Sequence, residues 1–437
     1  MLELALSPTN SERLHRLVQE APPSPGRGGE EAPKGARRLC FTEAAKGLSR
    51  AADERSRHDA VLQLVATLLP QPPCLHQESE QAADALSLVR ALLDIARPLG
   101  QATDNRYATH ALVAELVLAA LELLSRSGLD SLDDQALVLI VAYTDVHDPW
   151  TTQPSACLAT GLVAPRLSNG KLIPFIVGPV LQAYIRPIFS QSGGTVLRSG
   201  RPVQTRDAHQ SSLERPRWKE QDPFVVSVFR WAVDNADTPL IAGNWPLFLP
   251  VLLTLIEDPE VSVRENGLEI LIKFLQMCPP EMLLPTGLGA LFEDAIFPSL
   301  LSLPSSVEAQ NCITTLCLAY DVLLQLARAD REPRHQRKRR LLDRLIRDGI
   351  LAGHLNTSTH AVVIETLMHY VATAVDRLGI FATKHLEILL QNIDSIMTDP
   401  FAANASGRAY GTGSSHYYNM LGELAQSGGN SRNARNG

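Results

Sequence analysis

Few residues in this chain have the types and spacing that chemistry requires. Gly411 and Gly413 lie in a Gly-Thr-Gly-Ser-Ser stretch, but no strand and helix flank it, so a loop is favoured over a phosphate cradle. His354, His360 and His369 lack a carboxylate at ligand spacing, which favours surface histidines over a metal site. The chain contains no Walker A loop, zinc-protease motif or nucleophile elbow. The sequence therefore predicts no catalytic, cofactor-binding or metal-binding residue.

Composition and charge narrow the class of protein. Apolar residues make up 45% of the 437 residues and aromatic residues only 5%, and the abundance of Leu and Ala favours helices. A net charge of −7 gives no general attraction to nucleic acid or an acidic membrane. The six cysteines show no zinc-ligand spacing, which favours a reducing compartment. No signal peptide is predicted, and the most apolar helix, 111–124, contains two glutamates and falls short of a span of about 20 residues. We therefore expect no nucleic-acid or membrane partner and a cytoplasmic location, with the nucleus as a second compartment.

Apolar residues recur at helical spacing through most of the chain, and no stretch alternates as a strand would. The predicted helices lie at 11–21, 42–52, 58–69, 79–96, 107–127, 133–141, 180–190, 224–235, 247–257, 260–277, 288–301, 307–329, 336–354, 359–378 and 383–397. The predicted divisions are a short N-terminal helix at 1–21, a flexible linker at 22–38, an N-terminal helical region at 39–142, an irregular loop region at 143–179, a HEAT-like repeat region at 180–401 with a mobile loop near 191–223, and a disordered tail at 402–437.

The most informative motif occupies 258–271 and reads Asp-Pro-x-Val-x-x-Arg-x-x-Gly-x-x-x-Leu, between two apolar helical patterns. Its proline fits the first turn of a helix, and its glycine lets a neighbouring helix approach closely. The spacing resembles the turn signature of a HEAT repeat, and the residues that carry it are Asp258, Pro259, Val261, Arg264, Gly267 and Leu271. Helix pairs start roughly 40 to 50 residues apart, as in HEAT arrays. Together these features predict an all-α, HEAT-like helical-repeat solenoid, an α-α superhelix of the armadillo type.

Two parts of this repeat region carry specific expectations. Ile270 and Leu271 should be buried between stacked helices, while Asp258 and Arg264 should be exposed charges near the seam between repeats. In the helix predicted at 383–397, one apolar stripe should pack on the preceding helix, and it consists of Leu386, Leu389, Leu390, Ile393 and Met397. Ile388 and Ile396 lie off that stripe and should be partly uncovered.

Two groups of residues are candidates for contact with a partner. The basic run contains Arg337, Lys338, Arg339 and Arg340. A solvated loop that continues into an exposed helix face is the favoured interpretation of this run, and a patch for nuclear import or for an acidic partner is the alternative. The aromatic group contains Trp218, Trp231 and Trp245. Core or capping positions are favoured for the last two, and an exposed tryptophan would be an interface anchor.

Several motifs in order are similar to those of one protein family. They are Ile185-Arg-Pro-Ile-Phe189, Gly200-Arg201, Arg215-Pro-Arg-Trp-Lys219, Phe224-Val-Val-Ser-Val-Phe-Arg-Trp231, Asn244-Trp-Pro246, Gly287-Leu-Gly-Ala-Leu-Phe-Glu-Asp-Ala295, Arg340-Leu-Leu-Asp-Arg344, Asp348-Gly-Ile-Leu351, Leu378-Gly-Ile-Phe-Ala-Thr-Lys-His-Leu386 and Asp399-Pro-Phe-Ala402. Over residues 180–402 the chain resembles the fungal branch of the Tti-two family, the second Tel-two-interacting proteins.

This resemblance implies a HEAT-type scaffold subunit of the TTT co-chaperone complex and no enzymatic activity. The implied partners are the other helical-repeat subunits and, indirectly, the ninety-kilodalton heat-shock chaperone machinery and the phosphatidylinositol-3-kinase-related kinases that the complex matures. Members of the family usually continue past Asp-Pro-Phe-Ala into further helices, whereas Gly, Ser and Asn follow here. The resemblance therefore does not extend to any surface that those last helices make in the family.

Two other interpretations remain open at this point. A nuclear transport or trafficking adaptor could also use a HEAT array, and the basic run would then direct localisation. An enzyme could instead be hidden in the irregular region at 147–223, but it would need convergent polar side chains in a pocket, and none stands at a recognisable spacing.

Overall fold

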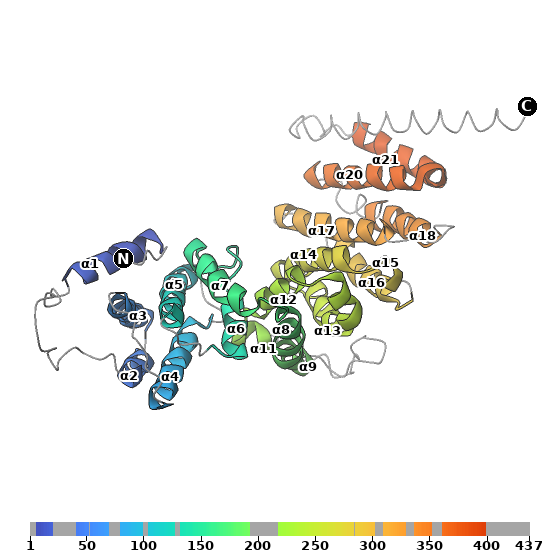
Figure 1. Ribbon diagram of the computed structural model, residues 1–437. Coiled ribbons are helices and arrows are strands. Elements are labelled where there is room, and N and C mark those ends of the chain that lie inside the picture. The colour runs from blue at the N-terminus through green and yellow to red at the C-terminus, as the bar shows by residue number, and fades with distance from the viewer. Residues whose placement is uncertain are drawn as a thin grey trace, which may run out of the picture. The chain divides into compact units, whose positions relative to one another are not determined.

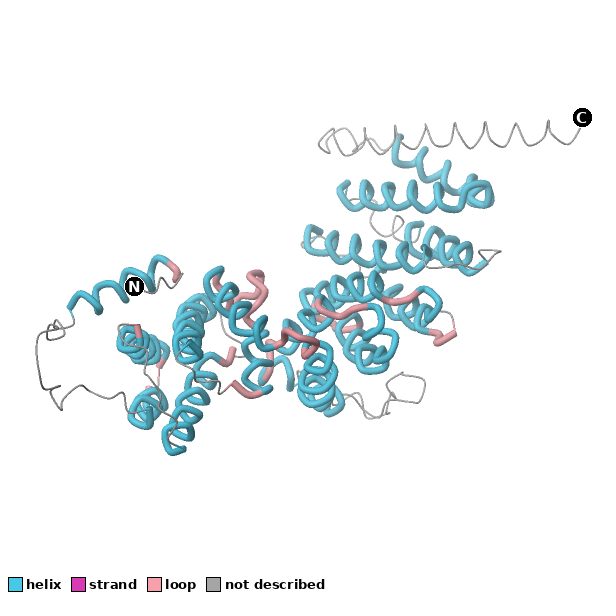
Figure 2. The backbone as a smooth tube through the Cα atoms, viewed as in Figure 1, coloured by secondary structure: helices cyan, strands magenta, loops and turns pink. Residues whose placement is uncertain are grey.

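The computed structural model describes residues 6–20, 41–51, 53–69, 79–98, 104–126, 132–192, 217–283, 285–301, 309–328, 336–351 and 361–398. Within these ranges the regular elements are all helices, joined by short connections (Figures 1 and 2). The predicted all-α helical-repeat class is confirmed. The chain divides into two compact units, Met1–Ala236 and Asp237–Gly437, and the boundary falls inside the predicted 180–401 region.

Helices of the first unit pack as successive layers, with α2 on α4, α3 on α5 and α5 on α7 (Figure 1). Helix α12 packs on η1. The elements of this unit are α1 (Pro8–Glu20), α2 (Phe41–Arg50), α3 (Glu54–Leu68), α4 (Ser79–Ala96), α5 (Asp104–Arg126), α6 (Asp134–Val141), α7 (Gln153–Arg166), α8 (Leu172–Phe175), η1 (Ile176–Ile185), α9 (Arg186–Ser192), α11 (Arg217–Gln221) and α12 (Val225–Asp234).

The prediction of an irregular loop region at 143–179 is wrong, because α7, α8 and part of η1 lie there. A capping box starts α7: the Thr152 hydroxyl accepts from the Ser155 N–H at 3.1 Å, and the Ser155 hydroxyl accepts from the Thr152 N–H at 2.8 Å. Pro154 lies in the first turn, where a missing N–H costs nothing. Polar and proline residues that indicated turns therefore belong to the beginning of a helix.

A buried carboxylate connects the helices of the first unit. Glu115 on α5 is fully buried, and its Oε1 accepts from the Ser7 N–H at 2.7 Å and from Asn10 Nδ2 at 3.0 Å. Its Oε2 accepts from the Thr152 hydroxyl at 2.6 Å. Asn10 Oδ1 lies 2.9 Å from His58 Nε2 on α3, and burial lowers the pKa of His58, which favours the neutral ring. The Glu115 side chain thus anchors α1 and the start of α7 to α5, and Asn10 connects this group to α3.

Among the described residues, three helical segments are long and apolar enough to cross a membrane, judged by length and composition alone: Tyr107–Arg126, Leu172–Ser190 and Thr238–Ile256. The first of these segments corrects the expectation that the apolar helix around 111–124 is too short to span a membrane. In α5, however, 72% of the residues in that window are buried inside the protein. The apolar surface of α5 is therefore used to pack against α3, α4 and α7.

In the second unit α13 packs on α14, α14 and α16 pack on α17, and α17 contacts α18 and α20 (Figure 1). Its elements are α13 (Thr238–Ile256), α14 (Val261–Met277), α15 (Pro280–Leu283), α16 (Leu288–Leu301), α17 (Ala309–Arg328), α18 (Gln336–Arg344), η2 (Leu345–Leu351), α20 (Ala361–Leu378), η3 (Gly379–His385) and α21 (Leu386–Thr398). Each helix thus covers an apolar face of the next, as in a helical-repeat array.

The beginning of α13 was predicted nine residues too late, at 247 rather than at Thr238. Asp237 caps the helix, because its Oδ1 accepts from the Leu240 N–H at 2.9 Å. Pro246 and Pro250 lie inside the helix and are exposed, so their rings face solvent. Prolines are normally helix breakers, and this is why the sequence pattern indicated a later start.

Several predicted features fall outside the described residues. They are the linker at 22–38, the tail at 402–437, residues 193–216 of the predicted mobile loop, the glycine-rich stretch at 411–415, and the histidines at 354 and 360.

Candidate protein-interaction surfaces

The predicted repeat turn joins α13 to α14 and is held by local hydrogen bonds. Asp258 Oδ1 accepts from the Glu260 N–H at 2.9 Å. Arg264 Nε donates to the Asp258 carbonyl at 3.0 Å, and its terminal nitrogen donates to the Pro259 carbonyl at 3.2 Å. The expectation that both charges are exposed is wrong, because Asp258 is buried and Arg264 is half-buried. Both side chains therefore form hydrogen bonds with backbone groups of the turn.

Residues on the buried face of α14 bring α13 into close contact. A Cβ built on Gly267 would lie 2.8 Å from the Leu255 carbonyl carbon, which is closer than real Cβ atoms approach. Ile270 and Leu271 are buried, as predicted, and Val261 is half-buried at the start of the helix. Phe274 lies between Phe248 of α13 and Phe292 of α16, with ring centroids 5.7 and 6.3 Å apart. The turn motif therefore marks a three-helix contact.

Gly267→Ala should destabilise the second unit by about 1–3 kcal/mol, because the added methyl overlaps the α13 backbone and the helices must separate. Gly243→Ala on α13 is the matched control, since a Cβ there meets nothing within 4 Å. It should be neutral or stabilising by up to about 1 kcal/mol. Chemical denaturation of both variants measures the difference. Equal stability of the two variants would contradict the close packing at Gly267.

The three tryptophans are divided between the two units and are not exposed. Trp218 is buried on α11, with its ring 5.5 Å from that of Phe189. Trp231 is half-buried, and its ring meets Phe175 edge-on at 6.1 Å. Trp245 is half-buried on α13. The burial of Trp218 therefore contradicts the suggestion that it binds a partner. Trp231 packs inside the first unit against Phe175.

The basic run lies on α18 and contacts its own unit. Arg337 pairs with Glu293 of α16 at 2.8 Å, with both side chains largely buried. The Arg339 guanidinium lies 3.6 Å from the centre of the Phe381 ring. Lys338 is half-buried, and only Arg340 of the four is exposed. A wholly solvated basic face is therefore a wrong expectation, because these cations join α18 to α16 and η3.

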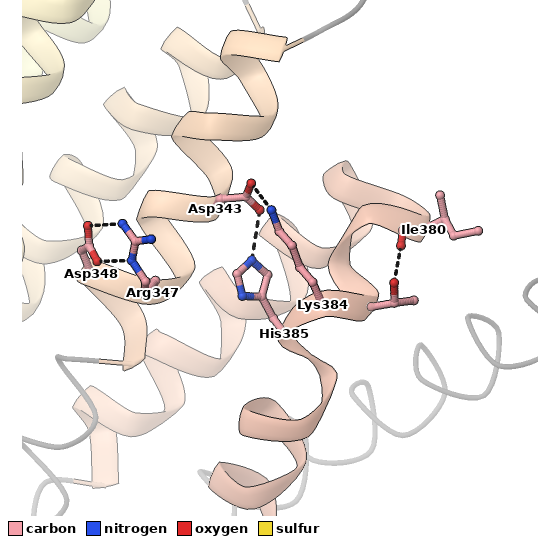
Figure 3. A network of polar contacts seen from close by, with 7 residues as sticks. Asp343, Arg347, Asp348, Ile380, Lys384 and His385 are labelled. Atoms are coloured by element: carbon pink, nitrogen blue, oxygen red, sulfur yellow. Dashed lines mark hydrogen bonds and ion pairs between the residues drawn. The ribbon is translucent and has the colours of Figure 1, made fainter.

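Asp343 forms a second connection from α18 to η3, which the sequence did not indicate. It accepts from Lys384, and its Oδ1 lies 3.0 Å from His385 Nε2 (Figure 3). On the next turn Arg347 and Asp348 form a bidentate pair (Figure 3). Lys384 and His385 immediately precede α21, so this junction fixes the place where the last described helix begins.

The apolar stripe of α21 is only half covered. Leu389 and Ile393 are buried, but Leu386 and Leu390 are 38% and 45% exposed, so the expectation that all of them pack on the preceding helix is wrong. Ile388 is 46% exposed and Ile396 is half-buried, so both are partly uncovered, as predicted. Leu386 and Leu390 therefore form an exposed apolar pair on one side of α21, and contiguous exposed apolar surface can mark an interaction site.

Polar side chains of the first unit converge at residues 145–148. Burial raises the pKa of Asp148 to about 6, although a Ser227 hydrogen bond opposes this. The Asp145 carboxylate accepts from the His147 N–H and lies 2.9 Å from His147 Nδ1, but the imidazole is largely exposed. Over the described ranges, no group of three or more His, Cys, Asp or Glu side chains is placed to hold a metal ion. His369 is exposed and packs edge-on against Tyr370.

The geometry thus consists of stacked helices, internally paired charges and an uncovered apolar helix face, which are properties of a protein-binding array. A comparison with protein families matches residues 136–404 to the model of the Tti2 family. The match begins in α6, covers the repeat turn and the basic run, and extends past α21. It covers more than half of the 437 residues. The chain therefore belongs to the Tti2 family.

Proposed function

We propose that this protein is a scaffold subunit of a TTT co-chaperone complex that supports the maturation and stability of phosphatidylinositol-3-kinase-related kinases. The observation that carries this proposal is the family match over residues 136–404. The Tti2 family suggests a TTT component and is a non-catalytic scaffold family. The helical-repeat architecture supports the proposal, because such arrays offer extended surfaces to other proteins.

The partners in this proposal are the other helical-repeat subunits of the complex, and through them the ninety-kilodalton heat-shock chaperone machinery and the kinases. Nucleic acid and membranes are not among the proposed partners. The protein would act in the cytoplasm and also in the nucleus. The rival function as a transport or trafficking adaptor is less well supported, because Arg337 and Arg339 already contact Glu293 and Phe381.

Affinity purification of the tagged protein from its native host at physiological salt tests this proposal. We expect two large helical-repeat proteins to co-purify in stoichiometric amounts, since a permanent assembly buries more than about 2,000 Å². Depletion of the protein should lower the steady-state level of PI3-kinase-related kinases, whereas the level of an unrelated kinase, the control, should not change. Elution of the protein alone, or unchanged kinase levels after depletion, would disprove the proposal.

A further inference from the structure

One side of α21 presents an apolar stripe that no other described helix covers completely. Successive residues of a helix are separated by about 100°, so Leu386, Leu389, Leu390 and Ile393 share one stripe about 100° wide. Leu389 and Ile393 are buried on one side of that stripe, whereas Leu386 and Leu390 on the other side are exposed. Helix α14 contacts α13 on one side and α17 on the other. Among the described elements, α21 instead packs chiefly on η3, the segment that directly precedes it in the chain. The exposed side therefore has the form of an unfilled helix-packing position.

The charges beside this stripe have one sign. Glu387 and Asp394 are both exposed, and helical spacing places them next to Leu390 on the side away from the buried residues. Neither carboxylate forms an ion pair with another described residue, whereas Lys384 is already paired with Asp343. An occupant that buries Leu386 and Leu390 would therefore meet two unpaired carboxylates along one edge. Lysine or arginine on the occupant would complement them.

The surface is held in place before any partner binds. Asp343 binds Lys384 and His385 in the turn that precedes α21 (Figure 3). Arg339 covers the Phe381 ring of η3 from the same helix. A helix face fixed in this way loses little conformational freedom on association, which favours binding.

We propose that the exposed side of α21, made of Leu386 and Leu390 with Glu387 and Asp394 along its edge, receives an amphipathic helix of another subunit. That helix would carry an apolar stripe bordered by lysine or arginine and would continue the helical stacking of the second unit. This inference rests on the proposed function, because it takes the occupant from the other TTT subunits. It adds the binding surface and the chemistry of the helix that binds there.

The test uses the full chain with the two other TTT subunits of the same organism, and it measures affinity by titration. Leu386→Asp combined with Leu390→Asp should weaken binding at least about 100-fold, because two apolar anchors become charged. Glu387→Lys with Asp394→Lys should weaken it about tenfold and slow association most at low salt. Met277→Asp on α14 is the matched control, since Met277 is 42% exposed in the same unit, and it should change affinity less than threefold, or about 0.6 kcal/mol.

The outcomes separate this inference from the proposed function. If the wild-type chain binds and the Leu386→Asp/Leu390→Asp variant binds equally well, the inference is wrong and the proposed function stands. If the wild-type chain binds neither subunit, the proposed function itself fails. Circular dichroism of each variant must match wild type, and the charge-reversal pair provides a second measurement if the aspartate pair unfolds α21.

Two further measurements test whether the occupant is instead the chain's own segment or a second copy of the chain. Hydrogen exchange of α21 in the isolated chain should be the same with and without residues 402–437; faster exchange after deletion would mean that the chain's own segment covers this side. Sedimentation of the isolated chain should show a monomer. A dimer that the Leu386→Asp/Leu390→Asp variant dissociates would assign the surface to a second copy and overturn the inference.

Discussion

Glu115→Ala is expected to detach α1 from the first unit and to lower its stability by about 3 kcal/mol or more, because several buried donors lose their acceptor together. The Ser7 N–H, the Asn10 amide and the Thr152 hydroxyl all donate to this one carboxylate. Water cannot easily replace it, since Glu115 and Asn10 are fully buried. The effect should exceed that of a surface ion pair several-fold.

Hydrogen-exchange mass spectrometry across α1 and α5 measures this effect. Glu122→Ala on the same helix is the control, since among the described residues Glu122 forms an i,i+4 pair with Arg126, and its loss should cost less than about 0.5 kcal/mol. Glu115→Gln should be intermediate, because the amide keeps one acceptor oxygen but turns an N–H₂ toward other donors. Retained protection of α1 in Glu115→Ala would show that apolar contacts alone hold that helix.

Local patterns were sufficient to predict most of the helices. The helices predicted at 79–96 and 288–301 coincide with α4 and α16. Both have a continuous apolar stripe that ends in residues unable to extend it, so local spacing determines the element. Helices that begin with a capped, proline-containing first turn, such as α7 and α13, were missed or shortened. There the cap outweighs the helix-breaking character of proline.

The surfaces were harder to predict, because they depend on residues far apart in the sequence. Spacing along the chain marked Arg337 as one of a basic group but gave no sign that Glu293 lies beside it. Asp343 was missed for the same reason, since its partners Lys384 and His385 are on another element. The exposure of Leu386 and Leu390 could not be read from the stripe, because periodicity shows which residues share a face but not whether another helix covers it.

Leu271→Ala is expected to destabilise the second unit by about 2–5 kcal/mol, because the side chain is fully buried and truncation leaves a cavity that rigid neighbours cannot fill. Leu271 follows Gly267 by one turn on the face of α14 that meets α13, so relaxation of α13 into the cavity is limited by the backbone contact at Gly267. We therefore expect a value in the upper half of this range.

Two matched variants separate packing from turn chemistry. Arg264→Ala removes two hydrogen bonds to turn carbonyls that water can partly replace, so it should cost about 1 kcal/mol. Met277→Ala on the same helix removes an exposed side chain and should change stability by less than about 0.5 kcal/mol. Chemical denaturation should rank the loss of stability as Leu271→Ala, then Arg264→Ala, then Met277→Ala. If Leu271→Ala cost no more than Arg264→Ala, the hydrogen-bonded turn rather than the buried helix face would be the main source of stability at this repeat.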